Sequence, residues 1–214
     1  MPDPRAVIVD VGGVLTTPLR DSFSAFCNAE GIELTALEAA IGDLLGVADD
    51  EHPVAQLESG LMELGAFEAW LASDLNRCLG TNIAGDGIAR RLLGGVSLEE
   101  RMLNAIARIR AAGLRAGLLS NSWGSTDYGP LGELFDAVVI SGDEGMRKPD
   151  PRIYRLAAER LDVDSATCVF VDDVAVNCEG AKSAGMLAIH HTDPDTTIAQ
   201  LEGLLGVRLR TTEL

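Results

Sequence analysis

The stretch Arg5-Ala-Val-Ile-Val-Asp10-Val-Gly-Gly-Val-Leu15 decides how this chain folds. The apolar, β-branched run before Asp10 predicts a short buried strand. Aspartate is depleted within strands, so Asp10 marks the point where this strand ends. In an open α/β sheet, ligands bind at the carboxyl ends of the strands. Asp10 and the loop that contains Gly12 and Gly13 are therefore expected at the opening of a cleft.

A second apolar run, Cys168-Val-Phe-Val-Asp172-Asp173, also ends in carboxylates. Between the two runs and beyond them, short apolar segments alternate with helical patterns. Strands are expected at 115–120, 137–140, 168–171 and 187–190, and helices at 98–112, 151–160 and 177–184, the first of them capped by Ser97-Leu-Glu-Glu100. This alternation predicts an α/β fold in which a doubly wound, Rossmann-like parallel sheet is covered by helices on both faces.

The stretch from about Pro18 to Gly95 has helical periodicity and almost no strand signal. We therefore expect a small all-helical insertion directly after the first strand. The predicted domains are an α/β core formed by 1–17 and 96–214, and a helical cap formed by 18–95.

The composition limits the kinds of partner. Among 214 residues, 17 Lys and Arg face 33 Asp and Glu, and the net charge is −16. This charge disfavours nucleic acids and anionic membranes, whose binding depends on cationic side chains.

No apolar run approaches the roughly 20 residues that cross a bilayer, and the N-terminus does not have the pattern of a signal peptide. A cytoplasmic protein is expected. The four cysteines are expected to be free thiols without a zinc site, and the oligomeric state stays open.

Four segments with polar residues follow the expected strands. They are Asp10 with Gly12-Gly13, Leu119-Ser120-Asn121-Ser122, Arg147-Lys148-Pro149, and Asp172-Asp173 with Asn177. Their order and spacing resemble the haloacid dehalogenase superfamily, which consists mostly of phosphatases, over nearly the whole chain. The stretch from Gly145 to Tyr154, followed by 169–173, is most similar to the branch with sugar-phosphate phosphatases and the N-terminal phosphatase domain of soluble epoxide hydrolase. The helical insertion corresponds to that family's cap domain.

The resemblance implies a role for each segment. Asp10 would be the nucleophile that forms an aspartyl-phosphate, and Lys148 would neutralise the phosphate and keep Asp10 ionised. The phosphate and substrate would contact the loop of Gly12 and Gly13 and the second segment. The further residues expected at the substrate are Ser120, Asn121, Trp123 and Asn177, the last as a support of the loop and of Lys148.

The resemblance also implies a magnesium site. Asp173 would bind Mg²⁺ directly, Asp172 would orient bound water, and Asp10 with the backbone carbonyl of Gly12 would complete the site. Independently of the family, adjacent carboxylates repel each other unless a cation lies nearby, and Mg²⁺ prefers carboxylates together with phosphate. The implied partner is a small phosphorylated metabolite.

Gly12 departs from the family pattern, in which a second aspartate transfers protons to the leaving alcohol and from water. Glycine has no such group. The loss of a general acid–base group costs roughly 10²–10⁴-fold in rate. Three hypotheses follow. The chain is a Mg²⁺-dependent phosphatase for good leaving groups such as an anomeric phosphate, a catalytically weak or silent binding protein, or a metal-independent 2-haloacid dehalogenase. The pair Asp172-Asp173 argues against the third.

Overall fold

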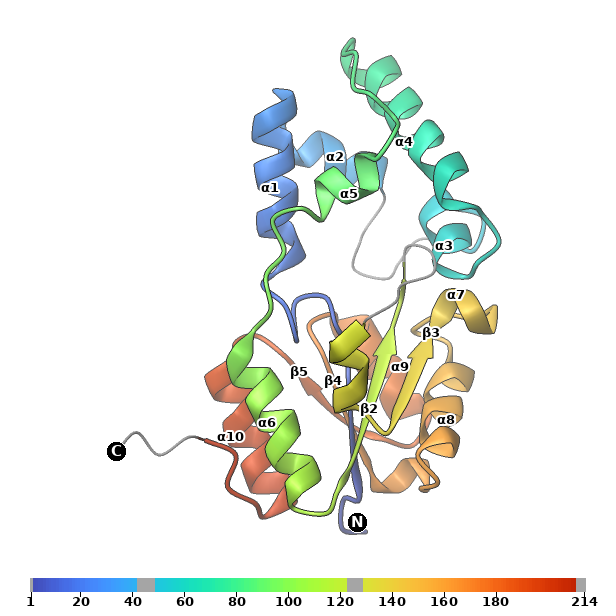
Figure 1. The fold of residues 1–214 in the computed structure, drawn as a ribbon. Coiled ribbons are helices and arrows are strands. Elements are labelled where there is room, and N and C mark those ends of the chain that lie inside the picture. Colours follow the sequence, from blue (N-terminus) through green and yellow to red (C-terminus); the bar gives the residue numbers. More distant parts are fainter. Residues whose placement is uncertain (1, 42–48, 123–128, 211–214) are drawn as a thin grey trace.

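The parallel sheet predicted from the sequence is present. The structure is a computed structural model that describes residues 2–41, 49–122 and 129–210. Its sheet has the order β3-β2-β1-β4-β5, with all pairs parallel (Figure 1). The strands are β1 (Ala6–Val9), β2 (Arg115–Ser120), β3 (Ala137–Ile140), β4 (Cys168–Asp172) and β5 (Leu187–His190). Val9 is paired with Leu118 and Val171, so the residues after β1, β2 and β4 meet at one edge.

Helices cover both faces of the sheet, as the doubly wound fold requires. Side chains alternate between the faces of a strand. In β1, Val7 and Val9 therefore pack with α6 (Glu100–Ala111) and α10 (Pro194–Leu205), whereas Ile8 packs with α8 (Pro151–Arg160) and α9 (Ala175–Ser183). Two separate apolar clusters hold the strands in place, which fixes the positions of their carboxyl ends.

Among the described residues between β1 and α6, five helices lie beyond the carboxyl edge of the sheet (Figure 1). They are α1 (Leu19–Glu30), α2 (Leu34–Ala40), α3 (Pro53–Glu58), α4 (Leu64–Leu79) and α5 (Ile88–Leu92). We call them the cap segment. A third apolar cluster with Phe23, Leu37 and Phe67 holds these helices together. The domain boundaries 1–17, 18–95 and 96–214 stay a prediction, which this separate cluster supports.

The two chain segments that join the cap segment to the sheet are paired with each other. Thr16 and Leu98 form an antiparallel bridge, and the Thr17 backbone N–H donates to the Ser97 carbonyl at 2.8 Å. The expectation that Ser97 caps the next helix is therefore wrong. Glu99 is the N-cap, and its carboxylate accepts from the Arg101 N–H at 3.1 Å. Pairing with Thr17 draws Ser97 away from the helix start.

Other elements differ from the expectation at their ends. Helix α9 begins two residues earlier than predicted, at Ala175, and β4 includes Asp172. The short helix α7 (Ser141–Glu144), α10, and the 3-10 turns Gly129–Leu134 and Ser165–Thr167 had no predicted counterpart. Within the described ranges, no helix is both long enough and apolar enough to cross a membrane.

Candidate functional site

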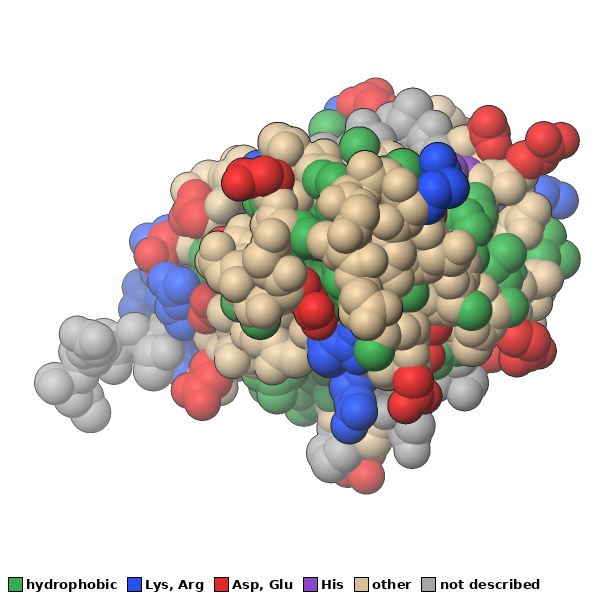
Figure 2. All heavy atoms as spheres, turned by 90° about the horizontal axis from the view of Figure 1, so that it is seen from above, with side chains coloured by type: hydrophobic (Ala, Val, Ile, Leu, Met, Phe, Trp, Pro, Cys, Tyr) green, Lys and Arg blue, Asp and Glu red, His purple; other side chains and the backbone are tan. Residues whose placement is uncertain are grey.

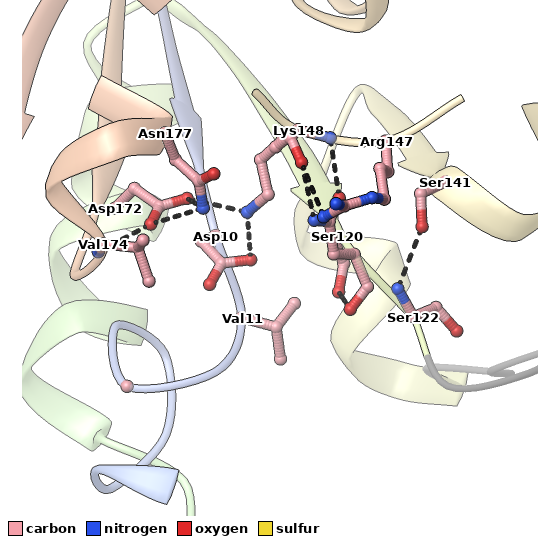
Figure 3. A network of polar contacts seen from close by, with 12 residues as sticks. Asp10, Val11, Ser120, Ser122, Ser141, Arg147, Lys148, Asp172, Val174 and Asn177 are labelled. Carbon is pink, nitrogen blue, oxygen red and sulfur yellow. Dashed lines mark hydrogen bonds and ion pairs between the residues drawn. The ribbon is translucent and has the colours of Figure 1, made fainter. Parts of the chain in front are cut away.

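One buried lysine lies between two carboxylates at the carboxyl edge of the sheet. The Nζ atom of Lys148 is 2.7 Å from Oδ1 of Asp10 and 2.7 Å from Oδ2 of Asp172 (Figure 3). Only 1% of the lysine side chain is exposed. Burial alone would lower the pKa of Lys148, but Asp10 and Asp172 raise it above its ordinary value. Lys148 is therefore a permanent cation in the site.

Asp10 follows β1 and is almost completely buried, with its backbone N–H bonded to the Val171 carbonyl at 2.9 Å. Burial raises the pKa of Asp10 from 3.8 to about 6, since the opposing effect of Lys148 is partly cancelled by the charge of Asp172. The ionised form of Asp10 therefore depends on the cation beside it. A carboxylate that is ionised beside a positive charge can act as a nucleophile.

Asp172 is fixed by a set of donors. Its Oδ1 accepts from the Val174 N–H at 2.8 Å and from Asn177 Nδ2 at 3.1 Å, and Asn177 Nδ2 is also 3.2 Å from Oδ2 (Figure 3). Together with Lys148, these contacts engage both carboxylate oxygens. Asn177 is held in turn by the Tyr154 hydroxyl, which donates to its carbonyl at 2.8 Å. Asn177 thus contacts Asp172 and reaches Lys148 only through it.

Asp173 lies directly against the loop that follows β1. A Cβ at Gly13 would be 2.2 Å from Oδ2 of Asp173, and Gly13 has a φ of +73°. Both facts require glycine at this position. Burial raises the pKa of Asp173 from 3.8 to about 7, and the charges of Asp10 and Asp172 add to the effect. The absence of a side chain at Gly13 therefore leaves room for a third carboxylate, which follows β4, and the repulsion among the three carboxylates is unfavourable.

These three carboxylates suit a divalent cation. Oxygens of Asp10, Asp172 and Asp173 all lie within 4.8 Å of one another. With all three ionised, one lysine leaves two negative charges uncompensated. A hard cation with oxygen ligands removes this repulsion, and carboxylates are the ligands that Mg²⁺ takes. The donor chemistry of the site thus fits the magnesium that the sequence pattern implies.

The second polar segment supports Lys148. Asn121 accepts from the Lys148 backbone N–H at 2.9 Å through Oδ1, and its Nδ2 donates to the Lys148 carbonyl at 3.1 Å. The amide side chain thus holds the backbone of Lys148 at both its N–H and its carbonyl. Ser120 lies buried at the end of β2, with its hydroxyl 3.5 Å from the Asn121 carbonyl. Trp123 lies outside the described residues.

Two residues near the site were not singled out by the sequence analysis. Glu58 ends helix α3 of the cap segment, and its Oε2 is 3.2 Å from Nη1 of Arg147. Arg147 belonged to a quoted motif but received no role. The two residues are 89 positions apart, and no local pattern links them. The available signal was Glu58 itself, an acidic residue at the end of a helix whose buried positions are apolar.

Comparisons with known proteins identify the family of this chain. Residues 4–185 match the haloacid dehalogenase-like hydrolase family. The sesquiterpene phosphatase astK of Aspergillus oryzae is 30% identical, over 80% of this chain and 98% of its own length. Bifunctional epoxide hydrolase 2 of Sus scrofa is 26% identical over 96% of this chain, which spans 39% of that longer protein.

A solved structure shows the same fold. The HAD family enzyme from Bacteroides thetaiotaomicron, in complex with magnesium and inorganic phosphate, superimposes with a TM-score of 0.61 at 18% identity. The match covers 88% of this chain and 94% of that one. Given the family match, the parallel sheet and the carboxylates at its edge, the chain belongs to the haloacid dehalogenase-like hydrolases.

Proposed function

We propose that this hydrolase is a Mg²⁺-dependent phosphatase that cleaves small phosphate monoesters through an aspartyl-phosphate on Asp10. The observation that carries the proposal is the contact of Lys148 with Asp10 in a cluster of three carboxylates. A phosphate group carries negative charge, so a site for it needs cations that offset those carboxylates. Lys148 is one such cation, and a divalent metal supplies the rest. The sesquiterpene phosphatase relative supports this class of reaction.

Asp10 would attack phosphorus with one carboxylate oxygen, and the bond from phosphorus to the ester oxygen would break. The leaving alkoxide takes a proton from solvent and departs as the alcohol, and the later hydrolysis of the aspartyl-phosphate returns a proton to solvent. Water then cleaves the aspartyl-phosphate, which releases inorganic phosphate and restores Asp10. Lys148 holds Asp10 ionised before the attack and faces the phosphate during it.

Mg²⁺ would be held by Asp10, Asp173 and the carbonyl of Gly12, and it would supply charge stabilisation for the phosphoryl group. Asp172 would act through Lys148 and bound water, because both of its oxygens already accept hydrogen bonds. Gly12 and Gly13 would present backbone groups to the phosphate, and the hydroxyl of Ser120 and the backbone N–H of Asn121 would hold a phosphate oxygen. Asn177 would keep Asp172 in place.

Gly12 shapes the substrate range that we propose. No side chain at this position transfers a proton to the leaving alcohol, so good leaving groups such as an anomeric phosphate should react best. The acidic and basic side chains seen over the cap segment are scattered in small groups (Figure 2). The face shown there has no broad basic surface in its described residues, which favours a small metabolite over a polyanion as substrate.

The test is a panel of phosphate monoesters that includes an anomeric sugar phosphate, assayed with Mg²⁺ and with a chelator. Turnover that needs the metal and disappears in Asp10→Asn would support the proposal. Absence of metal-dependent turnover on every ester would overturn it. In that case, binding of beryllium fluoride with Mg²⁺ would favour a silent binding protein, for which Gly12 is the motivating observation. Metal-independent halide release from a 2-haloacid would favour a dehalogenase.

A further inference from the structure

The cap segment reaches the candidate site through Glu58. Its side chain is 12% exposed and forms an ion pair with Arg147, which is 8% exposed. The same Oε2 accepts a hydrogen bond from Asn121 Nδ2 at 3.2 Å. Asn121 follows strand β2, and Arg147 lies in the loop before helix α8. One nearly buried carboxylate of the cap segment therefore contacts two loops at the edge of the sheet.

Beside this contact, the backbone of the cap segment lies close to the backbone of helix α7. Helix α3 packs against helix α7, and the Ser141 hydroxyl donates to the Glu58 carbonyl at 2.5 Å. A Cβ at Gly60 would lie 2.3 Å from the carbonyl oxygen of Gly142. Any side chain at position 60 would separate the two backbones. The position of Glu58 is thus set by the docking of helix α3 on helix α7, in addition to the contacts of its own side chain.

From Glu58, the contacts continue to Lys148. Asn121 holds the backbone N–H and carbonyl of Lys148, at 2.9 Å and 3.1 Å respectively. Arg147 is the neighbour of Lys148 and donates to the same carbonyl at 3.4 Å. The Nζ of Lys148 is in turn 2.7 Å from Asp10. The carboxylate of the cap segment is therefore two contacts away from the lysine that faces the nucleophile.

We propose that Glu58 is a positioning residue that couples docking of the cap segment to the placement of Lys148 beside Asp10. This proposal rests on the function proposed above for Lys148 and Asp10. When α3 leaves α7, Asn121 and Arg147 lose a charged partner, and a nearly buried arginine left without it favours a different position. Lys148 is then held less firmly. The site is complete only while the cap segment covers it, so that phosphoryl transfer occurs with bulk water excluded.

The kinetic test compares Glu58→Gln and Glu58→Ala with the control Glu38→Gln. Glu38 is also in the cap segment and forms an exposed ion pair with Arg20. Because misplacement of a catalytic group costs on the order of 100-fold, Glu58→Ala should lower kcat by about that factor with little change in KM. Glu58→Gln keeps an acceptor for Asn121 and should lose less. The control should match the unmodified protein.

A double variant separates positioning from general stability. If Glu58 acts through Arg147, adding Arg147→Met to Glu58→Gln should lower kcat little further. Losses that multiply independently would overturn the coupling. Assays far below the unfolding temperature of each variant remove the contribution of unfolded protein. A loss of stability without a change in kcat would also overturn the proposal, because it would assign Glu58 a purely structural role.

Hydrogen–deuterium exchange provides a readout that does not depend on activity. The Lys148 N–H is bonded to Asn121, so its exchange reports how firmly the peptide unit is held. Glu58→Gln should speed exchange in both α3 and the Arg147–Lys148 peptide, whereas Glu38→Gln should change neither. Faster exchange in α3 alone would overturn the coupling. If the unmodified protein hydrolyses no phosphate ester, the proposed function fails, and the exchange result still decides whether Glu58 positions Lys148.

Discussion

The Nζ atom of Lys148 lies 2.7 Å from Oδ1 of Asp10, in a site where only 1% of the lysine side chain is exposed. Because the same ammonium also contacts Asp172, it is the shared counter-ion of two buried carboxylates. This arrangement makes the lysine important for the stability of the protein and for the charge balance on which the proposed activity depends. The contributions to stability and to activity are separated when both are measured on the same variants.

Lys148→Met should destabilise the protein by about 3–5 kcal/mol, because removal of one partner leaves a buried charge uncompensated. It should also lower kcat by about 10²–10³-fold, since a group that stabilises transition-state charge is lost. Urea unfolding and steady-state kinetics measure the two effects. The control is Lys182→Met on helix α9, where the lysine is 52% exposed and paired with Glu179. A change within about 0.5 kcal/mol is expected for it, and equal losses in both variants would contradict the assigned role.

Asp173→Asn should raise stability when a chelator is present. The pKa of Asp173 is raised to about 7 by burial and by the charges of Asp10 and Asp172, so the ionised side chain opposes folding. One pKa unit corresponds to about 1.4 kcal/mol, and the gain at pH 8 should reach at most a few kcal/mol. Thermal unfolding with and without Mg²⁺ provides the measurement. The unmodified protein should be stabilised by Mg²⁺ and the variant much less; a variant that keeps the full response would refute direct binding by Asp173.

The chelated protein should lose stability as the pH rises from about 4 to about 7. The pKa values of Asp10 and Asp173 increase from 3.8 to about 6 and about 7 on folding, so the folded protein binds more protons in this window. The unfolding free energy then falls with rising pH. His191, whose pKa is lowered mainly by burial, acts in the opposite direction. The difference between the unmodified protein and Asp173→Asn cancels the histidine effect, and a flat difference curve would argue against the raised pKa of Asp173.

Mg²⁺ binding should depend on the protonation of the same carboxylates, Asp10 and Asp173, but it should become stronger as the pH rises. Mg²⁺ needs deprotonated carboxylates, so its affinity should increase across this pH window. Calorimetric titration at pH 5.5 and pH 8 measures the change. At 100 times the dissociation constant, a ligand stabilises the folded state by about 2.7 kcal/mol. Mg²⁺ should therefore offset much of the loss at high pH and little at low pH.

The local sequence pattern was enough to predict the sheet, because each strand is a short apolar run bounded by polar residues. Strands β2, β3 and β5 have the bounds expected from the sequence, and Asp10 and Asp172 meet because their strands are neighbours. Helix α10 was not predicted, although Asp193 and Pro194 form an ordinary helix start. The pairing of Glu58 with Arg147 depends on how the cap segment docks. Helical periodicity defines which face of α3 is buried and contains no information about the loop it meets.

The adjacent glycines Gly12 and Gly13 should respond in opposite ways to substitution. A Cβ at Gly12 would meet the flexible end of Leu19, 3.0 Å away, and the backbone there has no positive φ. A side chain at position 12 therefore needs only a small shift of Leu19. Gly12→Asp should fold and supply a carboxylic acid close to the site, and general acid–base catalysis is worth about 10²–10⁴-fold.

The expected signature lies in the dependence on the leaving group. With Gly12→Asp, kcat/KM for an alkyl phosphate should rise by up to about 10²-fold, whereas kcat/KM for p-nitrophenyl phosphate, which needs no protonation, should change little. Gly12→Ala is the matched control, since it adds the same Cβ without an acid and should show no gain. Gly13→Ala should lose metal-dependent activity, because its Cβ would displace Asp173. Equal behaviour of Gly12→Asp and Gly12→Ala towards all esters would show that proton transfer does not limit this hydrolase.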